Sequence, residues 1–292
     1  MNPLPRFYID TTVAIDGILA SPAARDFIRT HIEGNACASS FVWIEYNRTL
    51  VADCAILYNT AIEAVSIGDF SHRVENHWFL VKRPRRMQRC RNLRDSVLHD
   101  CERRDQSISI DEVRSQLRLY ALRLLPHRLS SLCRKQNPDK SISFSCPLEE
   151  PPRILGNGRI ELKMNCNKAK ADCVLPEIFK NRQPAVADIF SFLNLLKTKN
   201  LLDQDQSKML NILISSNKEA QIIFPRGQKA CFALGDLTIT LCCPDELPLL
   251  TTNVNHFAPL VVCINGTLLR LILSTPAIEK VDLSKWQHRR KS

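Results

Sequence analysis

Near its start the chain reads Phe7-Tyr8-Ile9-Asp10-Thr11-Thr12-Val13, a short apolar run that ends on an aspartate and two threonines. A short apolar run bounded by polar residues is typical of a buried strand, and we expect a strand over residues 6–10. A helix is predicted from Thr12 to Leu19, so that Asp10 would lie at the carboxyl end of the strand. Ligands of open parallel sheets bind at that edge, which makes Asp10 the first candidate site residue.

The same alternation continues along the chain. A helix is expected over 23–33, a short strand over 36–40 and a second helix over 41–57. Strands that alternate with helices predict an α/β fold in which helices cover a central parallel sheet.

Three further polar residues would reach the same edge. Glu45 lies in the helix expected over 41–57, Asp236 opens an apolar helical run, and Asn253 ends a strand expected over 247–252. Carboxylates are the ligands that Mg²⁺ and Mn²⁺ prefer, so the sequence predicts a divalent-metal site. Each residue also has a local interpretation. Asp10 and Asp236 could cap helices, Glu45 could be a solvated helix residue, and Asn253 could serve a turn. Asp16 and Asp188 are candidate extra ligands, but a role as surface or cap residues is the favoured interpretation.

Four segments together resemble the PIN-domain nucleases. They are Phe7 to Ile15, Ser39 to Glu45, Leu234 to Ile239 and Leu250 to Phe257. The resemblance implies a three-layer α/β/α core that cleaves single-stranded RNA with Mg²⁺ or Mn²⁺. It also implies a set of site residues: Asp10, Glu45 and Asp236 as metal ligands, Asn253 as a fourth catalytic residue, and Thr11, Thr12 and Thr252 in support.

Many members of that family are toxins of toxin–antitoxin pairs. The resemblance therefore implies a toxin or defence effector, with an inhibitory or antitoxin protein and a second copy of the chain as candidate partners. Thr12 stands where the family has Asn or Ser, and Asn255-His256 replaces its basic–acidic pair. These departures favour an alternative hypothesis, a catalytically degenerate module that binds nucleic acid or another protein.

The net charge is +10, and the surplus is concentrated in one stretch. Residues 82–94 hold seven basic residues and no acidic one. Such a run favours contact with the phosphates of a nucleic acid, although it could also be a solvated face or meet an acidic partner. The resemblance to the PIN-domain nucleases implies RNA rather than DNA. The predicted nucleic-acid-binding residues are Arg83, Arg85, Arg86, Arg89, Arg91 and Arg94.

The basic run lies in a middle region that differs from both ends. We expect a discontinuous PIN-like core over 1–60 and 181–292, with a basic, mainly helical insertion over 61–180. Ser109 and Glu112 are spaced as a helix capping box, and Pro126 should end or kink the helix that follows. A short strand is expected after the Asn157-Gly158 turn.

The remaining composition points to a cytoplasmic protein. The chain has no apolar run of the length that a membrane span needs and no signal-peptide pattern at its start. Its twelve cysteines are expected to be mostly buried thiols. A zinc site built from Cys90, His99 and Cys101 is a weaker alternative.

Overall fold

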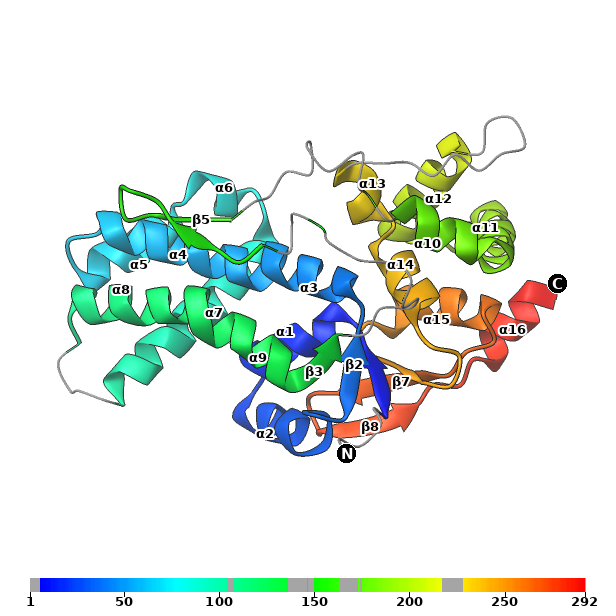
Figure 1. Cartoon of the computed structure of the whole chain (residues 1–292), viewed down its shortest axis with the longest axis horizontal. Helices are drawn as coiled ribbons and strands as arrows, with labels where there is room; N and C mark the ends of the chain where they lie inside the picture. The colour runs from blue at the N-terminus through cyan, green and yellow to red at the C-terminus, as the bar shows by residue number, and fades with distance from the viewer. Residues whose placement is uncertain are drawn as a thin grey trace.

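A six-stranded, mostly parallel β-sheet lies at the centre of the protein (Figure 1). The computed structural model describes residues 6–103, 108–135, 146, 150–162, 173, 175–216 and 228–291. The strand order is β3-β2-β1-β6-β7-β8, and only the pairing of β7 with β8 is antiparallel. The strands are β1 (Phe7–Ile9), β2 (Ala36–Ala38), β3 (Cys133–Lys135), β6 (Leu249–Thr251), β7 (Leu268–Ile272) and β8 (Ala277–Lys280). The predicted α/β fold with a parallel sheet is confirmed.

The chain leaves β1 and β6 in opposite directions along this sheet. From β1 it moves outward to β2, whereas from β6 it moves outward to β7. Because crossover connections between parallel strands are right-handed, such a reversal places the connecting helices on opposite faces. The carboxyl ends of β1 and β6 therefore flank the topological switch point, where open α/β sheets bind their ligands.

Helices lie on both sides of the sheet in Figure 1, with α1 and α2 to its left and α15 and α16 to its right. On the first side are α1 (Thr11–Leu19), α2 (Pro22–His31), α3 (Ser40–Tyr46), the π-helical η1 (Asn47–Val51) and α4 (Ala52–Glu63). The later part of the chain forms α10 (Leu175–Asn181), α11 (Gln183–Thr198), α12 (Gln204–Ser216), α13 (Gln228–Ala233), α14 (Gly235–Cys242), α15 (Val254–Cys263) and α16 (Ser284–Lys291). Helix α15 packs against α11 and α14, and α1 packs against α2 and α3.

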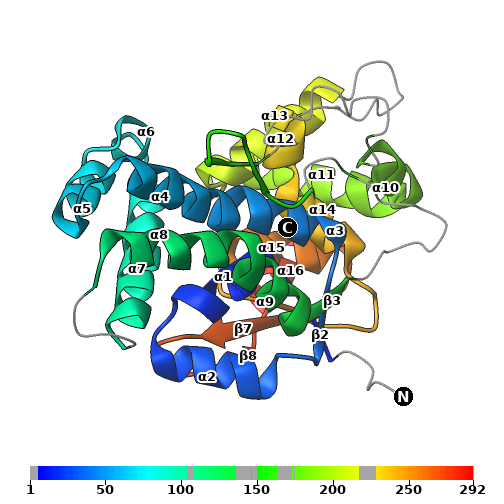
Figure 2. The same cartoon turned by 60° about the vertical axis from the view of Figure 1, so that its left-hand side comes forward.

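The middle of the chain extends this core as a helical lobe (Figure 2). It consists of α5 (Ile67–Glu75), α6 (Trp78–Val81), α7 (Pro84–Glu102), α8 (Ile110–Leu119), η2 (Tyr120–Leu124) and α9 (Leu125–Leu132). Helices α7 and α8 pack against α4, so the lobe continues the hydrophobic core. Strand β3 follows α9 and pairs with β2, which means that residues 133–135 of the expected insertion belong to the central sheet.

Local sequence signals in this lobe are confirmed with one exception. The capping box is present, since the Ser109 hydroxyl accepts from the backbone of Glu112 and the Glu112 carboxylate accepts from the backbone of Ser109. Pro126 is the exception: it does not end the helix, one of the two outcomes expected there, because helix continues through η2 into α9. A proline ring clashes with the carbonyl four residues before it, and the π-helical turn just before Pro126 changes that spacing.

A small β-hairpin packs against α4. Strands β4 (Arg153–Ile154) and β5 (Ile160–Glu161) pair across a turn in which Gly158 has a φ of +79°. The Asn59 side chain of α4 exchanges two hydrogen bonds of 2.9 Å with the backbone of Ile160, which fastens the hairpin to the lobe. The strand expected after the Asn157-Gly158 turn is thus present as β5.

Most described cysteines are buried among apolar side chains, as expected for thiols that serve as small core residues. Cys90 and Cys101 lie on the buried face of α7, whereas the His99 side chain is 65% exposed. The weaker zinc alternative is therefore not assembled on this helix. None of the described helices is both long and apolar enough to cross a membrane.

Candidate active site

Asp10 lies at the carboxyl end of β1 and is only 2% exposed. Its Oδ1 accepts a hydrogen bond of 3.3 Å from the backbone of Val13, so the residue does cap α1. Two hydroxyls also donate to it, from Thr12 at 2.8 and 2.9 Å and from Thr251 of β6 at 3.0 Å. Strands β1 and β6 are neighbours, and this contact across them fixes the carboxylate at the switch point. The capping role and the site position coincide in one residue.

Glu45 reaches the same region from α3. The hydroxyl of Thr11, the first residue of α1, donates to Glu45 Oε2 at 2.5 Å. This bond joins the helix after β1 to the helix after β2, because those two strands are adjacent in the sheet. Thr11 and Thr12 thus each orient one carboxylate, Glu45 and Asp10 respectively.

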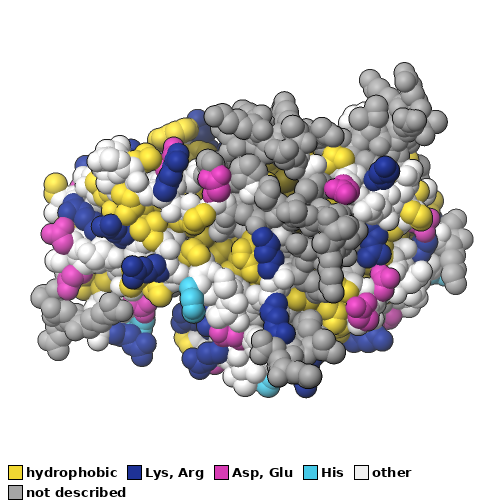
Figure 3. All heavy atoms as spheres, viewed as in Figure 1, with side chains coloured by type: hydrophobic (Ala, Val, Ile, Leu, Met, Phe, Trp, Pro, Cys, Tyr) yellow, Lys and Arg dark blue, Asp and Glu magenta, His cyan; other side chains and the backbone are white. Residues whose placement is uncertain are grey.

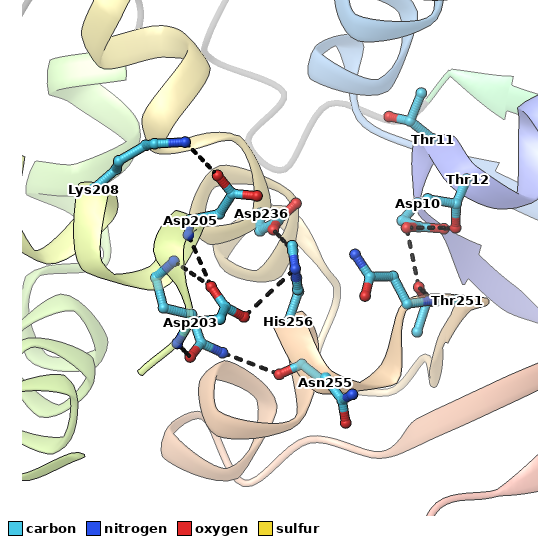
Figure 4. A network of polar contacts seen from close by, with 12 residues as sticks. Asp10, Thr11, Thr12, Asp203, Asp205, Lys208, Asp236, Thr251, Asn255 and His256 are labelled. Atoms are coloured by element: carbon cyan, nitrogen blue, oxygen red, sulfur yellow. Dashed lines mark hydrogen bonds and ion pairs between the residues drawn. The ribbon is translucent and has the colours of Figure 1, made fainter. Parts of the chain in front are cut away.

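Asp236 lies in the first turn of α14 and does not cap that helix, whose N-cap is Leu234. The ring of His256 points at Asp236, with Nδ1 3.0 Å from Oδ2, and its other nitrogen lies 3.5 Å from Asp203 Oδ2 (Figure 4). The hydrogen bond with Asp236 raises the pKa of His256, and the negative charges of Asp236 and Asp203 contribute in the same direction. His256 is therefore a counter-charge for this side of the site.

Thr252 and Asn253 follow β6, and their polar groups make different contacts. The Thr252 hydroxyl lies 2.8 Å from Thr12 Oγ1 and 3.1 Å from Asp16 Oδ2. The backbone of Asn253 donates to Thr251 at 2.8 Å, and its side chain makes no capping hydrogen bond to α15. Asp16, interpreted from the sequence as a surface or cap residue, is instead part of this hydroxyl network.

Three carboxylates from distant parts of the chain thus share one electrostatic environment. Burial raises the pKa of Asp10 to about 7, with a further contribution from the charge of Asp236. Burial also raises the pKa of Glu45 to about 7, and Asp236 is the next cause. Like charges held together in a poorly solvated place disfavour ionisation, and a bound cation would relieve that repulsion.

The donor set suits a hard divalent cation. Asp10, Glu45 and Asp236 offer only carboxylate oxygens, and the surrounding hydroxyls hold two of them in place. In the described part of the chain, no three acidic, histidine or cysteine side chains are already grouped as closely as bound metal ligands are. His256, which occupies one oxygen of Asp236, would have to share or release that carboxylate when an ion binds.

Arg48 is a site residue that the sequence did not single out. It lies one turn after Glu45, in η1, and is only 5% exposed. Its charge counteracts the raised pKa of Glu45. The spacing of three from Glu45 on a helix could have indicated it, since residues three and four apart share one face.

The arginines of α7 are mostly engaged inside the protein. Arg86 and Arg89 bind the fully buried Asp53 of α4, the latter at 3.0 Å. Arg91 and Arg94 bind Glu75 of α5, the latter at 2.9 Å.

Arg83 and Arg85 are the two predicted nucleic-acid-binding residues that remain exposed. The guanidinium of Arg83 lies over the Phe79 ring. The pKa of Asp205 on α12 is lowered by a hydrogen bond from Lys208 first and, among smaller causes, by the charge of Arg85. Among the described side chains on the face drawn in Figure 3, basic and acidic groups are interspersed and form no single basic tract.

Comparisons of this chain with models of known protein families, with curated proteins and with solved structures found no match. The resemblance to PIN-domain nucleases therefore depends on the motif residues themselves and on where the fold places them.

Proposed function

We propose that this protein is a metal-dependent endoribonuclease with a PIN-like three-layer core, which hydrolyses phosphodiester bonds of single-stranded RNA. The observation that carries the proposal is the convergence of Asp10, Glu45 and Asp236 at the switch point of the sheet. Asp53 and Glu75 are paired with arginines, whereas Asp10 and Glu45 are held by hydroxyls in the field of a third carboxylate. His256 and Arg48 compensate this cluster only in part, and carboxylates with raised pKa values are candidate functional residues.

In the proposed site Asp10, Glu45 and Asp236 hold Mg²⁺ or Mn²⁺. Such an ion supplies a bound water of lowered pKa and neutralises charge on the leaving oxygen. The chain's own residues keep the ligands in position: Thr12 and Thr251 fix both oxygens of Asp10, and Thr11 fixes Glu45.

Other residues serve the substrate in this proposal. The side chain of Asn253, which caps no helix, is assigned to the attacking water or the ion. Arg83 and Arg85 are the first contacts for RNA phosphates, because their guanidinium groups are exposed. Arg86, Arg89, Arg91 and Arg94 could join only by exchanging an intramolecular carboxylate for a phosphate. A role as a toxin or defence effector, with an inhibitory protein as partner, remains the biological part of the hypothesis.

The test is cleavage of end-labelled single-stranded RNA and DNA by the purified protein, in Mn²⁺ and in EDTA. We expect RNA to be cut only in Mn²⁺ and the Asp10→Asn/Asp236→Asn variant to lose at least about 10²-fold in rate, because two metal ligands are gone. Cleavage that persists in EDTA or in the double variant would contradict the assignment.

One observation favours the second candidate, a module that binds RNA without cutting it. His256 already compensates Asp236, and Asp203 lies on its other nitrogen. RNA binding by the wild type without cleavage in any divalent metal would select this candidate. In that case His256→Ala would be the variant in which to look for restored metal binding.

A further inference from the structure

The strongest unexplained feature of the molecule is the buried guanidinium of Arg48. The residue is 5% exposed, and its Nη1 makes one weak contact of 3.9 Å with the sulfur of Cys231. Its Nε and Nη2 have no hydrogen-bond partner among the described residues. Burial lowers the pKa of Arg48, yet a guanidinium stays charged at neutral pH. Among the described residues, the protein thus keeps a cation with two unpartnered nitrogens in the field of Glu45.

A buried guanidinium without hydrogen bonds lowers the stability of the fold unless a ligand supplies them. A buried charge without hydrogen bonds destabilises a folded protein, as a broken buried ion pair does. The charge of Glu45 raises the pKa of Arg48, but the hydrogen bond of Glu45 Oε2 comes from Thr11. Among the described residues no acceptor occupies Nε and Nη2, and because both atoms are buried, a phosphate reaches them only when the side chains around Arg48 move apart.

The guanidinium also has an aromatic neighbour. Arg48 lies over the ring of Phe232 of α13, with 2.9 Å between its Cζ and the ring centroid. Phe232 is nevertheless 54% exposed, which is unusual for a phenylalanine with one face covered. Aromatic rings that remain exposed beside cationic groups are the platforms on which single-stranded nucleic acids stack their bases.

We propose that Arg48 and Phe232 form a nucleotide subsite next to the carboxylates, in which Arg48 binds a backbone phosphate and Phe232 stacks one base of a single-stranded RNA. This inference deepens the proposed function and rests on it for the identity of the substrate. The planar fork of an arginine matches the oxygens of a phosphate. Arg48 also lies in a π-helical segment, a rare element that occurs frequently at functional sites.

The subsite predicts a specific pattern of RNA binding. Affinity for a short labelled single-stranded RNA is measured in EDTA, where metal-dependent cutting is off. Arg48→Gln should raise Kd about tenfold and reduce the slope of log K against log salt by about 0.7, the value of one phosphate contact on a single strand. Arg48→Lys should recover part of the affinity, because it keeps the charge and loses the fork. Phe232→Ala should raise Kd about tenfold, and Phe232→Tyr should not.

A matched control is available on α2. Arg29 has a 62% exposed side chain that pairs with Asp26, and Arg29→Gln removes the same charge from the surface. Its Kd and salt slope should equal those of the wild type. RNAs with one phosphate replaced by a neutral methylphosphonate sharpen the comparison. One position should weaken binding by the wild type but not by Arg48→Gln, since both changes remove the same contact.

A structural role for Arg48 predicts a different result. Replacing a buried unpaired cation by glutamine should leave the melting temperature unchanged or raise it. A lower melting temperature together with wild-type RNA affinity would overturn the subsite, as would equal Kd values for Arg48→Gln and Arg29→Gln in a protein that still cuts RNA. Loss of affinity in a protein that binds but never cuts would support the subsite and reject only the nuclease. A wild type that binds no RNA would overturn both proposals.

Discussion

Two charged regions of this molecule contrast sharply. The arginines of α7 are compensated by acids of the same protein, since Asp53 holds Arg86 and Arg89. Around the carboxyl end of β1, by contrast, Asp10 and Glu45 of α3 lie in the field of Asp236, and burial together with the charge of Asp236 raises the pKa of both. Groups with perturbed pKa values are more frequent at functional sites than in structural ion pairs. The most basic stretch of sequence is thus largely paired inside the protein, whereas the acidic residues of the candidate site are compensated only in part.

The largest effect on stability should come from breaking the compensated region. Asp53→Asn would leave Arg86 and Arg89 without their fully buried partner, and we expect unfolding free energy to fall by about 3 kcal/mol. Urea unfolding measures it. An unchanged unfolding free energy would show that these ion pairs do not stabilise the lobe.

Replacing an acidic residue of the candidate site should have the opposite effect and raise the unfolding free energy. In the folded protein Asp10 keeps its proton up to about pH 7, whereas in the unfolded chain the carboxyl ionises near pH 4. Its contribution is therefore neutral below the unfolded pKa and becomes destabilising as pH rises toward the folded pKa. Asp10→Asn should make the protein more stable than wild type by about 2–4 kcal/mol above pH 7 in EDTA, with little difference near pH 4. Urea titrations at both ends of this range test it, and a less stable variant above pH 7 would refute the raised pKa.

A smaller effect should follow from an exposed pair of the compensated region. Glu75 is 35% exposed and binds Arg91 and Arg94, whose side chains are 43% and 15% exposed. Glu75→Gln should cost only about 0.5–1 kcal/mol, because water replaces most of what the pair supplied. The same urea assay applies. If Glu75→Gln lowered the unfolding free energy as much as Asp53→Asn, burial would not explain a difference between the buried and the exposed ion pairs.

The sequence predicted the parts of the fold that local patterns encode. An apolar run ending at Asp10 and another ending near Asn253 correctly placed β1 and β6, because period and polarity mark where buried strands stop. The capping box at Ser109 likewise needs only neighbouring residues. Strand β3 escaped prediction because it is a three-residue edge strand, Cys133–Lys135, in which two residues are basic.

What the sequence could not show is which charges meet. Asp53 lies on α4 and Glu75 on α5. The basic run contains no acidic residue in sequence, but in the folded protein its arginines are paired with acidic side chains of these two helices. The ring of His256 reaches Asp236 because α14 and α15 pack together. It reaches Asp203 because Gln206 of α12 donates a hydrogen bond of 3.0 Å to the backbone of Asn255 and so holds the start of α12 against α15 (Figure 4). The sequence did not indicate a role for Arg48, because an isolated arginine in a helix is usually exposed to solvent.

The most direct test of the central claim is the binding of Mn²⁺, followed by the loss of the free-ion signal in electron paramagnetic resonance. The wild type should bind Mn²⁺, and Asp10→Asn/Asp236→Asn should not, because two of the three carboxylate ligands are gone. The control variant Asp26→Asn/Asp188→Asn removes equal charge from two exposed acids and should bind as the wild type does. Equal binding by both double variants, or none by the wild type, would contradict a metal site at the switch point.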